Sequence, residues 1–475
     1  MSFISIEFVL FFIPVLIIFL VLKGVWQKRF LAFASVVFIG LISIKFMVYA
    51  LLISTINFGL AQRIERNRKG EKVTTVYYAG QILNIGGLII YKYLGFIFDN
   101  VNLIFKFNVP DDFFTLAVPL GISYYTFQSI SYLYLVWKAG DKSEKVFSEF
   151  ILYMLFFPKF LAGPIERHRK FLPQLKTNNL SKGREVKEGL RLILWGAFKK
   201  VMLGDTLGIV INKVYADVEG FSALPLWLTF LIQPMQIYGD FSGYTDMAIG
   251  LAKLLGIQLS PNFNRPFFAK SVGQYWKRWH ISLSSWCNDF IYNRLMLKYR
   301  RRGNVAILYA LFVTFMIIGI WHGAKWTFVI IGFLQVLALT YEFYSKKWRM
   351  HLFNRIPTEV GNIVSYALVY LFSAFFHIFF YSNNLSDALA FISGLFNFSQ
   401  ISLSWGLNIP HFDFALALLT IVFVLSYEYL TEKGKDVSAW FFRWPVALRW
   451  SVYYLSIFVT FHFAKNALFF IYADF

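Results

Sequence analysis

The sequence predicts an all-α polytopic membrane protein, and three observations carry that prediction. Of the 475 residues, 58% are hydrophobic, 20% are aromatic and only 15% are charged, which is far from the average of a soluble protein. Apolar runs that approach the thickness of a bilayer recur from one end of the chain to the other. The polar stretches between them are too short to bury cores of their own. We therefore expect a single membrane domain over residues 1–475.

The charge and cysteine content exclude several other classes of protein. The formal net charge of +20 indicates cytoplasmic loops rich in Lys and Arg rather than nucleic-acid binding, because the chain is so apolar. One cysteine, Cys287, excludes an intrachain disulfide framework and a zinc cluster of paired cysteines, and we expect it to be a small core residue. His168, His377 and His462 lack the spacing of metal ligands, so we expect packing or interfacial roles for them and no metal site.

The membrane spans follow from the alternation of apolar runs with basic cytoplasmic loops and outer loops poor in Lys and Arg. The first run precedes its positive residues and is interpreted as a retained span with an extracytoplasmic N-terminus, and the last leaves the C-terminus on the same side. We predict about eleven full spans from twelve apolar runs, two of them shorter than the rest (30–44 and 46–61). The runs cover residues 4–22, 30–44, 46–61, 73–98, 113–137, 189–212, 224–255, 304–320, 326–344, 361–381, a run that ends near Lys433, and 447–472.

Two segments depart from ordinary spans. Residues 147–173 are apolar but broken by Pro158, Pro164 and Pro173, which predicts a re-entrant segment, because such backbone is tolerated at membrane depth only where protein or a cavity surrounds it. The span at 224–255 has a high density of polar residues for hydrocarbon. These polar residues are Gln233, Gln236, Asp240, Ser242, Tyr244, Thr245 and Asp246.

Two histidines lie in a basic, Trp-rich stretch and at the end of the apolar run that follows it. His280 occurs in the string WKRWHISLSSW, and a run of roughly 18 apolar residues leads to His322 in GIWHGAKW. Helical spacing would place Trp276 and Lys277 near the face of His280. An interfacial helix is the ordinary interpretation of this basic patch, whereas an ionisable residue inside a membrane, such as His322, indicates either a functional site or a packed residue at a hairpin turn.

Six strings resemble, in family order, the bacterial branch of the membrane-bound O-acyltransferase family that acetylates alginate and other envelope polysaccharides. Each string alone is a weak pattern, but six in order are specific. They are VPLGISYYTFQSISYL at 118–133, FFPKFLAGPIERHRKF at 156–171, DFSGYTDMAIGLAKLLGIQL at 240–259, NFNRPF at 262–267, YWKRWHISLSSW at 275–286 and GIWHGAKW at 319–326.

The resemblance implies a family core at about 118–345, in which transmembrane, re-entrant and interfacial helices surround a central cavity in the inner membrane of a bacterium. The chain departs from the branch after Trp286. There the branch usually continues with a segment like RDYLYIPLGG, whereas this chain has CNDFIYNRLMLKYRRRG. Asp289 and Tyr292 match, but the Pro-Leu-Gly-Gly turn is missing.

Acyl transfer from a thioester to a hydroxyl requires a base for the hydroxyl proton, and histidine suits that task at neutral pH. The resemblance implies that His322 is the catalytic histidine and that His280 is a second active-site residue, which we expect to orient the thioester or the acceptor. Simple hydropathy nevertheless places the basic patch in the cytoplasm and His322 at the outer end of its hairpin, a bilayer away. The separation of the two histidines is therefore the test of a shared site.

A polar network and a set of binding residues complete the predicted site. Asp240, Tyr244 and Asp246 are expected either to orient His322 or to close a hydrogen-bond network, and pairing of the acids with Arg265 or Lys277 is the alternative. Basic residues suit the phosphates of coenzyme A, although cytoplasmic bias accounts for most of them. The residues predicted to bind the acyl donor or substrate are Trp276, Lys277, Arg278, Ser282, Trp286, Arg265 and Trp321.

The resemblance implies an O-acyltransferase without a permanently bound cofactor. Its expected co-substrate is acetyl-CoA or an acyl-carrier thioester on the cytoplasmic side, and its expected product is an O-acetylated envelope polysaccharide, made through an extracytoplasmic acetyltransferase partner. D-alanyl transfer to teichoic acid from a carrier protein is one alternative. A transporter, with residues 156–171 and 240–246 along its pathway, is the other.

Overall fold

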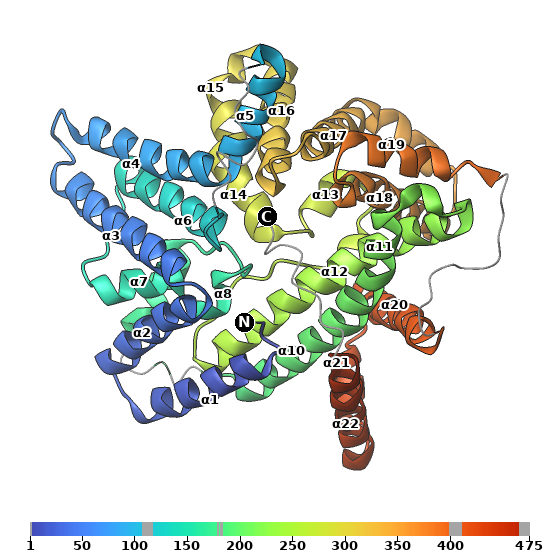
Figure 1. Ribbon diagram of the computed structural model, residues 1–475, viewed down its shortest axis with the longest axis horizontal. Coiled ribbons are helices and arrows are strands. Elements are labelled where there is room, and N and C mark those ends of the chain that lie inside the picture. Colours follow the sequence, from blue (N-terminus) through green and yellow to red (C-terminus); the bar gives the residue numbers. More distant parts are fainter. Residues whose placement is uncertain (1, 107–116, 178–179, 181–183, 399–410, 465–475) are drawn as a thin grey trace. The chain divides into compact units, whose positions relative to one another are not determined.

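The computed structural model is built from helices over the residues that it describes, which are 2–106, 117–177, 180, 184–398 and 411–464 (Figure 1). The chain divides into two compact units. One unit comprises Met1–Ile193 with Thr245–Ser260, and the other comprises Leu194–Tyr244 with Pro261–Phe475. That residues 1–475 act as a single domain therefore stays a prediction.

The first unit is a bundle of apolar helices in which α2 packs on α3 and α7, and α4 packs on α6. Ser43 ends α2 and caps α3 by accepting a hydrogen bond from the backbone N–H of Phe46, so the turn between the predicted spans 30–44 and 46–61 lies at Ser43. The helices are α1 (Ile6–Val21), α2 (Val25–Ile42), α3 (Ile44–Arg66), α4 (Val73–Leu88), η1 (Ile89–Tyr93), α5 (Leu94–Phe105), α6 (Ile122–Tyr134), η2 (Leu135–Ala139), α7 (Phe147–Leu155), α8 (Phe157–Phe160), α9 (His168–Phe171) and η3 (Leu172–Lys176).

The segment predicted to be re-entrant, 147–173, forms the short helices α7, α8 and α9 and the start of η3, and its side chains are buried throughout residues 149–166. Even Lys159 is buried, and its Nζ donates to Gln128 Oε1 over 3.1 Å. Burial inside protein is the condition under which broken helices persist at membrane depth.

The second unit carries the long helices of the C-terminal half, and α10 and α12 are each divided between the two units. Its elements are α10 (Val186–Lys199), η5 (Lys200–Asp205), α11 (Thr206–Ala216), η6 (Val218–Gly220), α12 (Ala223–Leu254), η7 (Pro266–Phe268), α13 (Val272–Trp276), α14 (Ile281–Cys287), η8 (Asn288–Tyr292), α15 (Asn293–Lys298), η9 (Arg300–Arg302), α16 (Asn304–His322), α17 (Trp326–Phe353), α18 (Thr358–Tyr381), α19 (Leu385–Gly394), α20 (His411–Glu432), α21 (Val437–Phe442) and α22 (Val446–Phe463).

Helices α16 and α17 form a tight hairpin because glycines face each other along it. A Cβ on Gly319 would lie 2.5 Å from the Phe328 carbonyl oxygen, and one on Gly332 would lie 2.7 Å from that of Phe315. Small residues let the backbones of membrane helices approach closely. The hairpin therefore holds the end of α16 in a fixed position.

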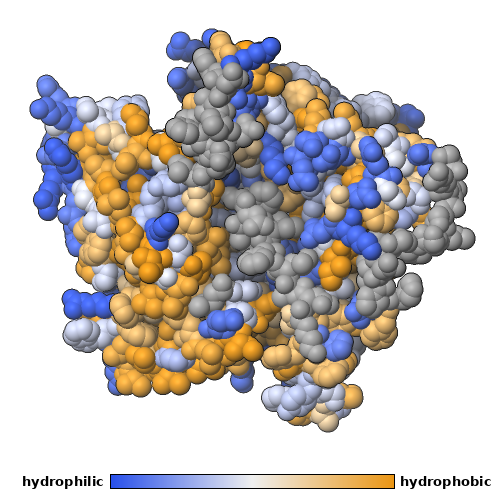
Figure 2. Space-filling model, in the orientation of Figure 1, coloured by the Kyte–Doolittle hydropathy of each residue, from blue (hydrophilic) through white to orange (hydrophobic). Residues whose placement is uncertain are grey.

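The protein is a multi-pass membrane protein. Among the described residues, seven helices are long and apolar enough to span a bilayer, and each corresponds to a predicted span. Figure 2 shows broad apolar surface over the first unit, with hydrophilic side chains at the turn between α3 and α4. The seven are Val25–Ile42, Ile44–Arg66, Val73–Phe105, Asn304–His322, Trp326–Phe353, Thr358–Tyr381 and Phe412–Glu432.

The remaining predicted spans match the structure less closely. The run at 4–22 forms α1, which is 16 residues long and thus shorter than a typical span. The predicted spans at 113–137 and 447–472, and the predicted outer loop at 382–411, lie partly outside the described residues. The extracytoplasmic position of both termini stays a prediction.

Candidate active site

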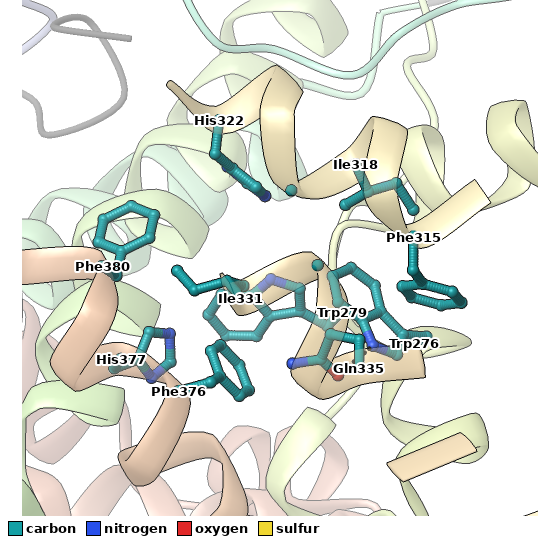
Figure 3. A pocket seen from close by; sticks show the side chains of 12 residues that line it. Trp276, Trp279, Phe315, Ile318, His322, Ile331, Gln335, Phe376, His377 and Phe380 are labelled. Atoms are coloured by element: carbon teal, nitrogen blue, oxygen red, sulfur yellow. Dashed lines mark hydrogen bonds between the residues drawn. The ribbon is translucent and has the colours of Figure 1, made fainter. Parts of the chain in front are cut away.

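His322 is the last residue of α16 and is 6% exposed. Its imidazole ring lies 5.0 Å from the ring of Trp321, 5.9 Å from that of Phe380 and 6.3 Å from that of Phe328, measured between ring centres. Figure 3 shows the imidazole pointing from α16 into the space bounded by Phe380, Ile331 and Trp279. The structure therefore directs His322 into a pocket rather than into the bilayer.

His280 lies between two short helices, so the predicted helical face shared by Trp276, Lys277 and His280 is wrong. Helix α13 ends at Trp276, α14 begins at Ile281, and His280 has φ 43° and ψ 53°, in the left-handed region. A non-glycine residue there costs on the order of 1 kcal/mol or more, and such strain concentrates at functional sites. Tertiary contacts hold the turn, because the Ile281 N–H donates to the Asn262 carbonyl oxygen over 2.9 Å.

The two histidines are close together. Their rings pack against the same indole, that of Trp321, with ring centres 5.8 Å away for His280 and 5.0 Å away for His322. Because both imidazoles pack against one indole, the distance between them is far below the roughly 30 Å thickness of a hydrocarbon core. The prediction from simple hydropathy that they lie a bilayer apart is therefore wrong. At a rise of about 1.5 Å per residue, α16 itself bridges that thickness from η9 to His322.

The pocket beneath His322 is small and predominantly aromatic. Its volume is about 20 Å³, and all the residues that line it belong to the second unit. Its polar side chains are His322, His377 and Gln335, and no acidic residue occurs among the twelve described residues that line it. The lining residues are Trp276, Trp279, Phe315, Ile318, Gly319, His322, Ile331, Gly332, Gln335, Phe376, His377 and Phe380.

A larger cavity of about 420 Å³ adjoins this pocket, since Trp276, Phe315 and Ile318 line both. Lys277 is the only charged side chain among the described residues that line it. Its other polar lining residues come from α14, η8 and α16 and are Ser284, Ser285, Asn288, Tyr292 and Thr314.

The chain stays helical where the related pattern would place a Pro-Leu-Gly-Gly turn. Helix α14 continues into the π-helix η8 and then into α15. π-helical turns are frequent at functional sites. Here the turn gives two side chains to the larger cavity, those of Asn288 and Tyr292.

Comparisons with known proteins identify similar sequences that include the region of this pocket. The model of the membrane-bound O-acyltransferase family matches residues 124–364, which include the pocket residues from Trp276 to Gln335. The chain is 30% identical over 407 residues to the peptidoglycan O-acetyltransferase of Helicobacter pylori, covering 80% of this chain and 75% of that protein. It is also 30% identical over 455 residues to the probable alginate O-acetylase AlgI of Pseudomonas syringae pv. tomato, covering 92% of this chain and 85% of that protein.

The chain belongs to the membrane-bound O-acyltransferase family. It is therefore a transferase that uses an acyl donor as co-substrate. A more distant similarity is to the teichoic acid D-alanyltransferase of Bacillus subtilis, which is 28% identical over 272 residues, covering 54% of this chain and 68% of that protein.

His377 is a pocket residue of this O-acyltransferase for which the sequence predicts only packing or an interfacial role. It is 2% exposed, lies on α18 with its ring 6.0 Å from that of Phe380, and has Nδ1 3.4 Å from Ser373 Oγ. Its position inside an apolar span was the available signal, because ionisable residues there indicate functional sites. His168, by contrast, packs in the first unit with Nε2 2.8 Å from Asp141 Oδ2.

Two of the predicted donor-binding residues have an acidic partner within the chain. Arg265 Nε and Arg278 Nη2 each donate to a carboxylate oxygen of Glu432 over 2.8 Å. Arginine–carboxylate pairs of this kind fix backbone positions, and they account for both guanidinium charges without a ligand. Of the other predicted residues, Trp276 and Lys277 line the cavities, Trp321 separates the two histidines, and Ser282 and Trp286 are buried in α14.

Of the predicted polar residues, Asp240 takes part in a buried cluster of charges, and its expected role in orienting His322 stays a prediction. Asp240 pairs with Lys200, whose Nζ lies 2.6 Å from Asp240 Oδ1 and 2.5 Å from Asp205 Oδ1. Arg265 and Lys277 were the alternative partners expected for the acids. Arg265 instead pairs with Glu432, and Lys277 lines the larger cavity. Tyr244 is buried in α12 within the second unit, whereas Asp246 belongs to the first unit and thus to a separately described body.

Among the described residues, no group of three His, Cys, Asp or Glu side chains is placed to hold a metal ion. Cys287 is buried, as expected for a small core residue.

Proposed function

We propose that this O-acyltransferase takes an acetyl group from acetyl-CoA on the cytoplasmic side of the membrane and transfers it, through an extracytoplasmic partner, to a cell-envelope polysaccharide. The observation that carries the choice of acetyl is the size and chemistry of the pocket beneath His322. About 20 Å³ is space for roughly one water-sized group, which suits a methyl or a carbonyl oxygen and not a long acyl chain.

The lining of the pocket also argues against D-alanine. A D-alanyl group carries an ammonium, and a buried charge is costly unless an opposite charge meets it. The described residues that line the pocket include no Asp or Glu. An acetyl group, which is neutral, needs no such partner.

His322 is proposed as the base that accepts the proton of the acceptor hydroxyl. As the hydroxyl oxygen attacks the thioester carbonyl carbon, the C–S bond breaks, and the proton held by His322 passes to the leaving thiolate. General acid–base catalysis of this kind contributes about 10²- to 10⁴-fold. His280, held beside Trp321 in a strained turn, is proposed to orient the reactants.

The larger cavity is the proposed route for the donor. One part of its wall is polar and consists of Lys277 and side chains with hydroxyl or amide groups. The part that it shares with the pocket is apolar and includes Phe315 and Ile318. That order suits a thiol arm that is polar along its length and carries a small acyl group at its tip. Lys277 would meet a phosphate as a point charge.

The proposed acceptor rests on the two more similar relatives, whose names give peptidoglycan and alginate as the acetylated polymers. Both are glycans with free hydroxyls. Inverted membrane vesicles that contain this protein, its partner and the envelope glycan test the proposal when they are supplied with labelled acetyl-CoA. We expect base-labile acetyl label on the glycan with wild type and none with His322→Ala.

A matched control uses another histidine of the second unit. His351 is exposed near the end of α17, outside the pocket, and His351→Ala should label the glycan at the wild-type rate. Transfer of labelled D-alanine from a carrier protein, with no transfer of acetyl, would replace acetyl by D-alanyl in the proposal. Uptake of solute by the vesicles without any acyl transfer would favour a transporter.

A further inference from the structure

Gln335 lies on α17 in the wall of the pocket and is 1% exposed. Its side chain is oriented by Trp276, whose indole Nε1 lies 3.0 Å from Gln335 Oε1. An indole N–H can only donate, so it must meet the oxygen of the amide. The amide nitrogen of Gln335 therefore faces away from Trp276, and Figure 3 shows it on the side of Phe376.

This amide nitrogen has no hydrogen-bond partner among the residues that the structure describes. Leaving a buried donor unpaired costs about 1–3 kcal/mol. Two other buried glutamines of the same unit differ from Gln335, because both the nitrogen and the oxygen of their amides have a hydrogen-bond partner. Gln233 Nε2 donates to the Ala374 carbonyl over 2.7 Å, and Gln233 Oε1 accepts from the Tyr215 hydroxyl over 2.9 Å.

The second of these glutamines is Gln236. Its Nε2 donates to the Gly204 carbonyl over 2.8 Å, and its Oε1 accepts from the Tyr381 hydroxyl. The unit thus gives both amide atoms of Gln233 and Gln236 a partner, although among the described residues it leaves the buried amide nitrogen of Asn262 without one. At Gln335 it fixes the oxygen and leaves the donor directed into the pocket below His322.

We propose that the Gln335 amide donates a hydrogen bond to the carbonyl oxygen of the bound acyl thioester and stabilises the oxyanion that forms there when the hydroxyl attacks. This inference rests on the proposed acetyl transfer. Gln335 exchanges no proton in the step, since the hydroxyl proton goes to His322 and then to the thiolate as the C–S bond breaks. A donor fixed in advance, in a wall that is mostly apolar, is the arrangement that stabilises a developing oxyanion.

The orientation of the amide depends on Trp276, which makes Trp276 a positioning residue. Without its N–H the amide can rotate by half a turn and present its oxygen to the pocket. An oxygen there would repel the oxyanion. Trp276→Phe should therefore slow the reaction while keeping an aromatic ring in the wall.

The test compares Gln335→Met with Gln233→Met in purified protein supplied with acetyl-CoA, partner and glycan. Removal of one oxyanion donor lowers kcat by about 10²- to 10³-fold, and we expect that loss for Gln335→Met. The control Gln233→Met breaks two buried hydrogen bonds outside the pocket and should lower the unfolding temperature with kcat within a few fold of wild type. Trp276→Phe should give a smaller loss of kcat than Gln335→Met.

A binding measurement separates a role at the carbonyl from a structural one. S-ethyl-CoA resembles acetyl-CoA but has no carbonyl oxygen, so wild type and Gln335→Met should bind it equally, whereas the variant should lose affinity for acetyl-CoA. Wild-type transfer together with an unchanged kcat for Gln335→Met would overturn the role of Gln335 and leave the proposed function standing. If the wild type transfers no acetyl, the proposed function fails, and the role of Gln335 fails with it.

Discussion

Two groups of buried polar side chains in the second unit show opposite ways of placing such groups in a membrane protein. At the start of η5, Lys200 lies within 2.6 Å of carboxylate oxygens of both Asp205 and Asp240, and all three side chains are at most 3% exposed. In the pocket, His322 and His377 lie among aromatic rings with no acidic residue in the described lining, and Gln335 keeps an unpaired donor.

The two groups differ in whether their polar atoms pair with one another within the fold or can still bind a ligand. Buried charges that neutralise one another are expensive to disturb but have little capacity left for a ligand. Neutral polar groups in an apolar wall cost less to bury and keep donors and acceptors for a substrate. The sequence made Asp240 a candidate for the site and His377 a packing residue, and the structure places them in the opposite groups.

The largest expected effect tests the charged group. Lys200→Met removes the cation that both buried carboxylates contact, which should lower the free energy of unfolding by about 3–5 kcal/mol. Chemical denaturation in detergent measures the change. The activity of the fraction that remains folded should stay near wild type, because the cluster lies outside the pocket lining.

The same substitution at an exposed lysine is the control. Lys347→Met, on α17, should change the free energy of unfolding by less than about 0.5 kcal/mol. If the two variants unfold alike, the cluster does not stabilise the fold, and the comparison between the two groups fails.

The next effect concerns the indole of Trp321, against which both histidine rings pack. Trp321→Ala removes the indole that both rings touch, so the imidazoles lose their fixed separation. Misplacement of reacting groups by about 1 Å costs on the order of 10²-fold in rate. We expect a loss of that size in kcat, measured with labelled acetyl-CoA.

A tryptophan outside the pocket provides the matched control. Trp227, whose Nε1 donates to the Leu395 carbonyl over 2.8 Å, can be changed to Ala with a cost in stability but no comparable cost in kcat. Equal losses of kcat for Trp321→Ala and Trp227→Ala would show that the indole of Trp321 has no special part in the site.

A third prediction concerns the size of the pocket. Phe376→Ala enlarges the wall opposite His322, so the enzyme should accept propionyl-CoA better relative to acetyl-CoA. One methylene in an apolar pocket is worth about 10-fold or more in kcat/KM, and a shift of about 10-fold in the ratio of the two substrates is expected. Phe375→Ala, one residue away and outside the lining, should leave the ratio unchanged.

The smallest effect belongs to an ion pair near the surface. In the first unit, Arg169 donates two hydrogen bonds to Asp141, and this guanidinium holds the pKa of the carboxyl below its ordinary value of 3.8. Arg169 is 56% exposed, so solvent screens the pair, and Arg169→Gln should cost at most about 1 kcal/mol at pH 7.

The pH dependence of this pair has a definite sign. Because the folded state lowers the pKa of Asp141, the stabilisation is present above the unfolded value and is lost as the pH falls through the folded one. The difference between wild type and Arg169→Gln should therefore shrink as the pH drops below about 4, measured by thermal unfolding. A difference as large as that of Lys200→Met would mean that burial does not set the energy of these pairs.

Local properties explain what sequence reasoning predicted well. The positions of the long spans follow from hydropathy and from basic loops, and both can be read residue by residue. His322 was predicted because it ends an apolar run within a string typical of the family, and it lies in the pocket. Trp276 was predicted for the same reason and contributes to the pocket wall.

Long-range contacts explain what the sequence did not predict. Arg278 pairs with Glu432, which lies 154 positions further along the chain, so the local charge pattern does not predict this ion pair. The helix expected through His280 breaks because Asn262 binds the backbone that follows the turn. A single sequence contains the partners in each case but not their proximity.

By itself, the sequence determined that this chain is a helical, multi-pass membrane O-acyltransferase with a candidate catalytic histidine at the end of an apolar run. Only the tertiary structure decided which polar residues meet that histidine. The hairpin of α16 and α17 is closed by Gly319 and Gly332, and it places Gln335 in the same pocket as His322. Hydropathy records how each residue partitions between water and lipid, whereas the direction of a buried donor depends on packing between segments far apart in the chain.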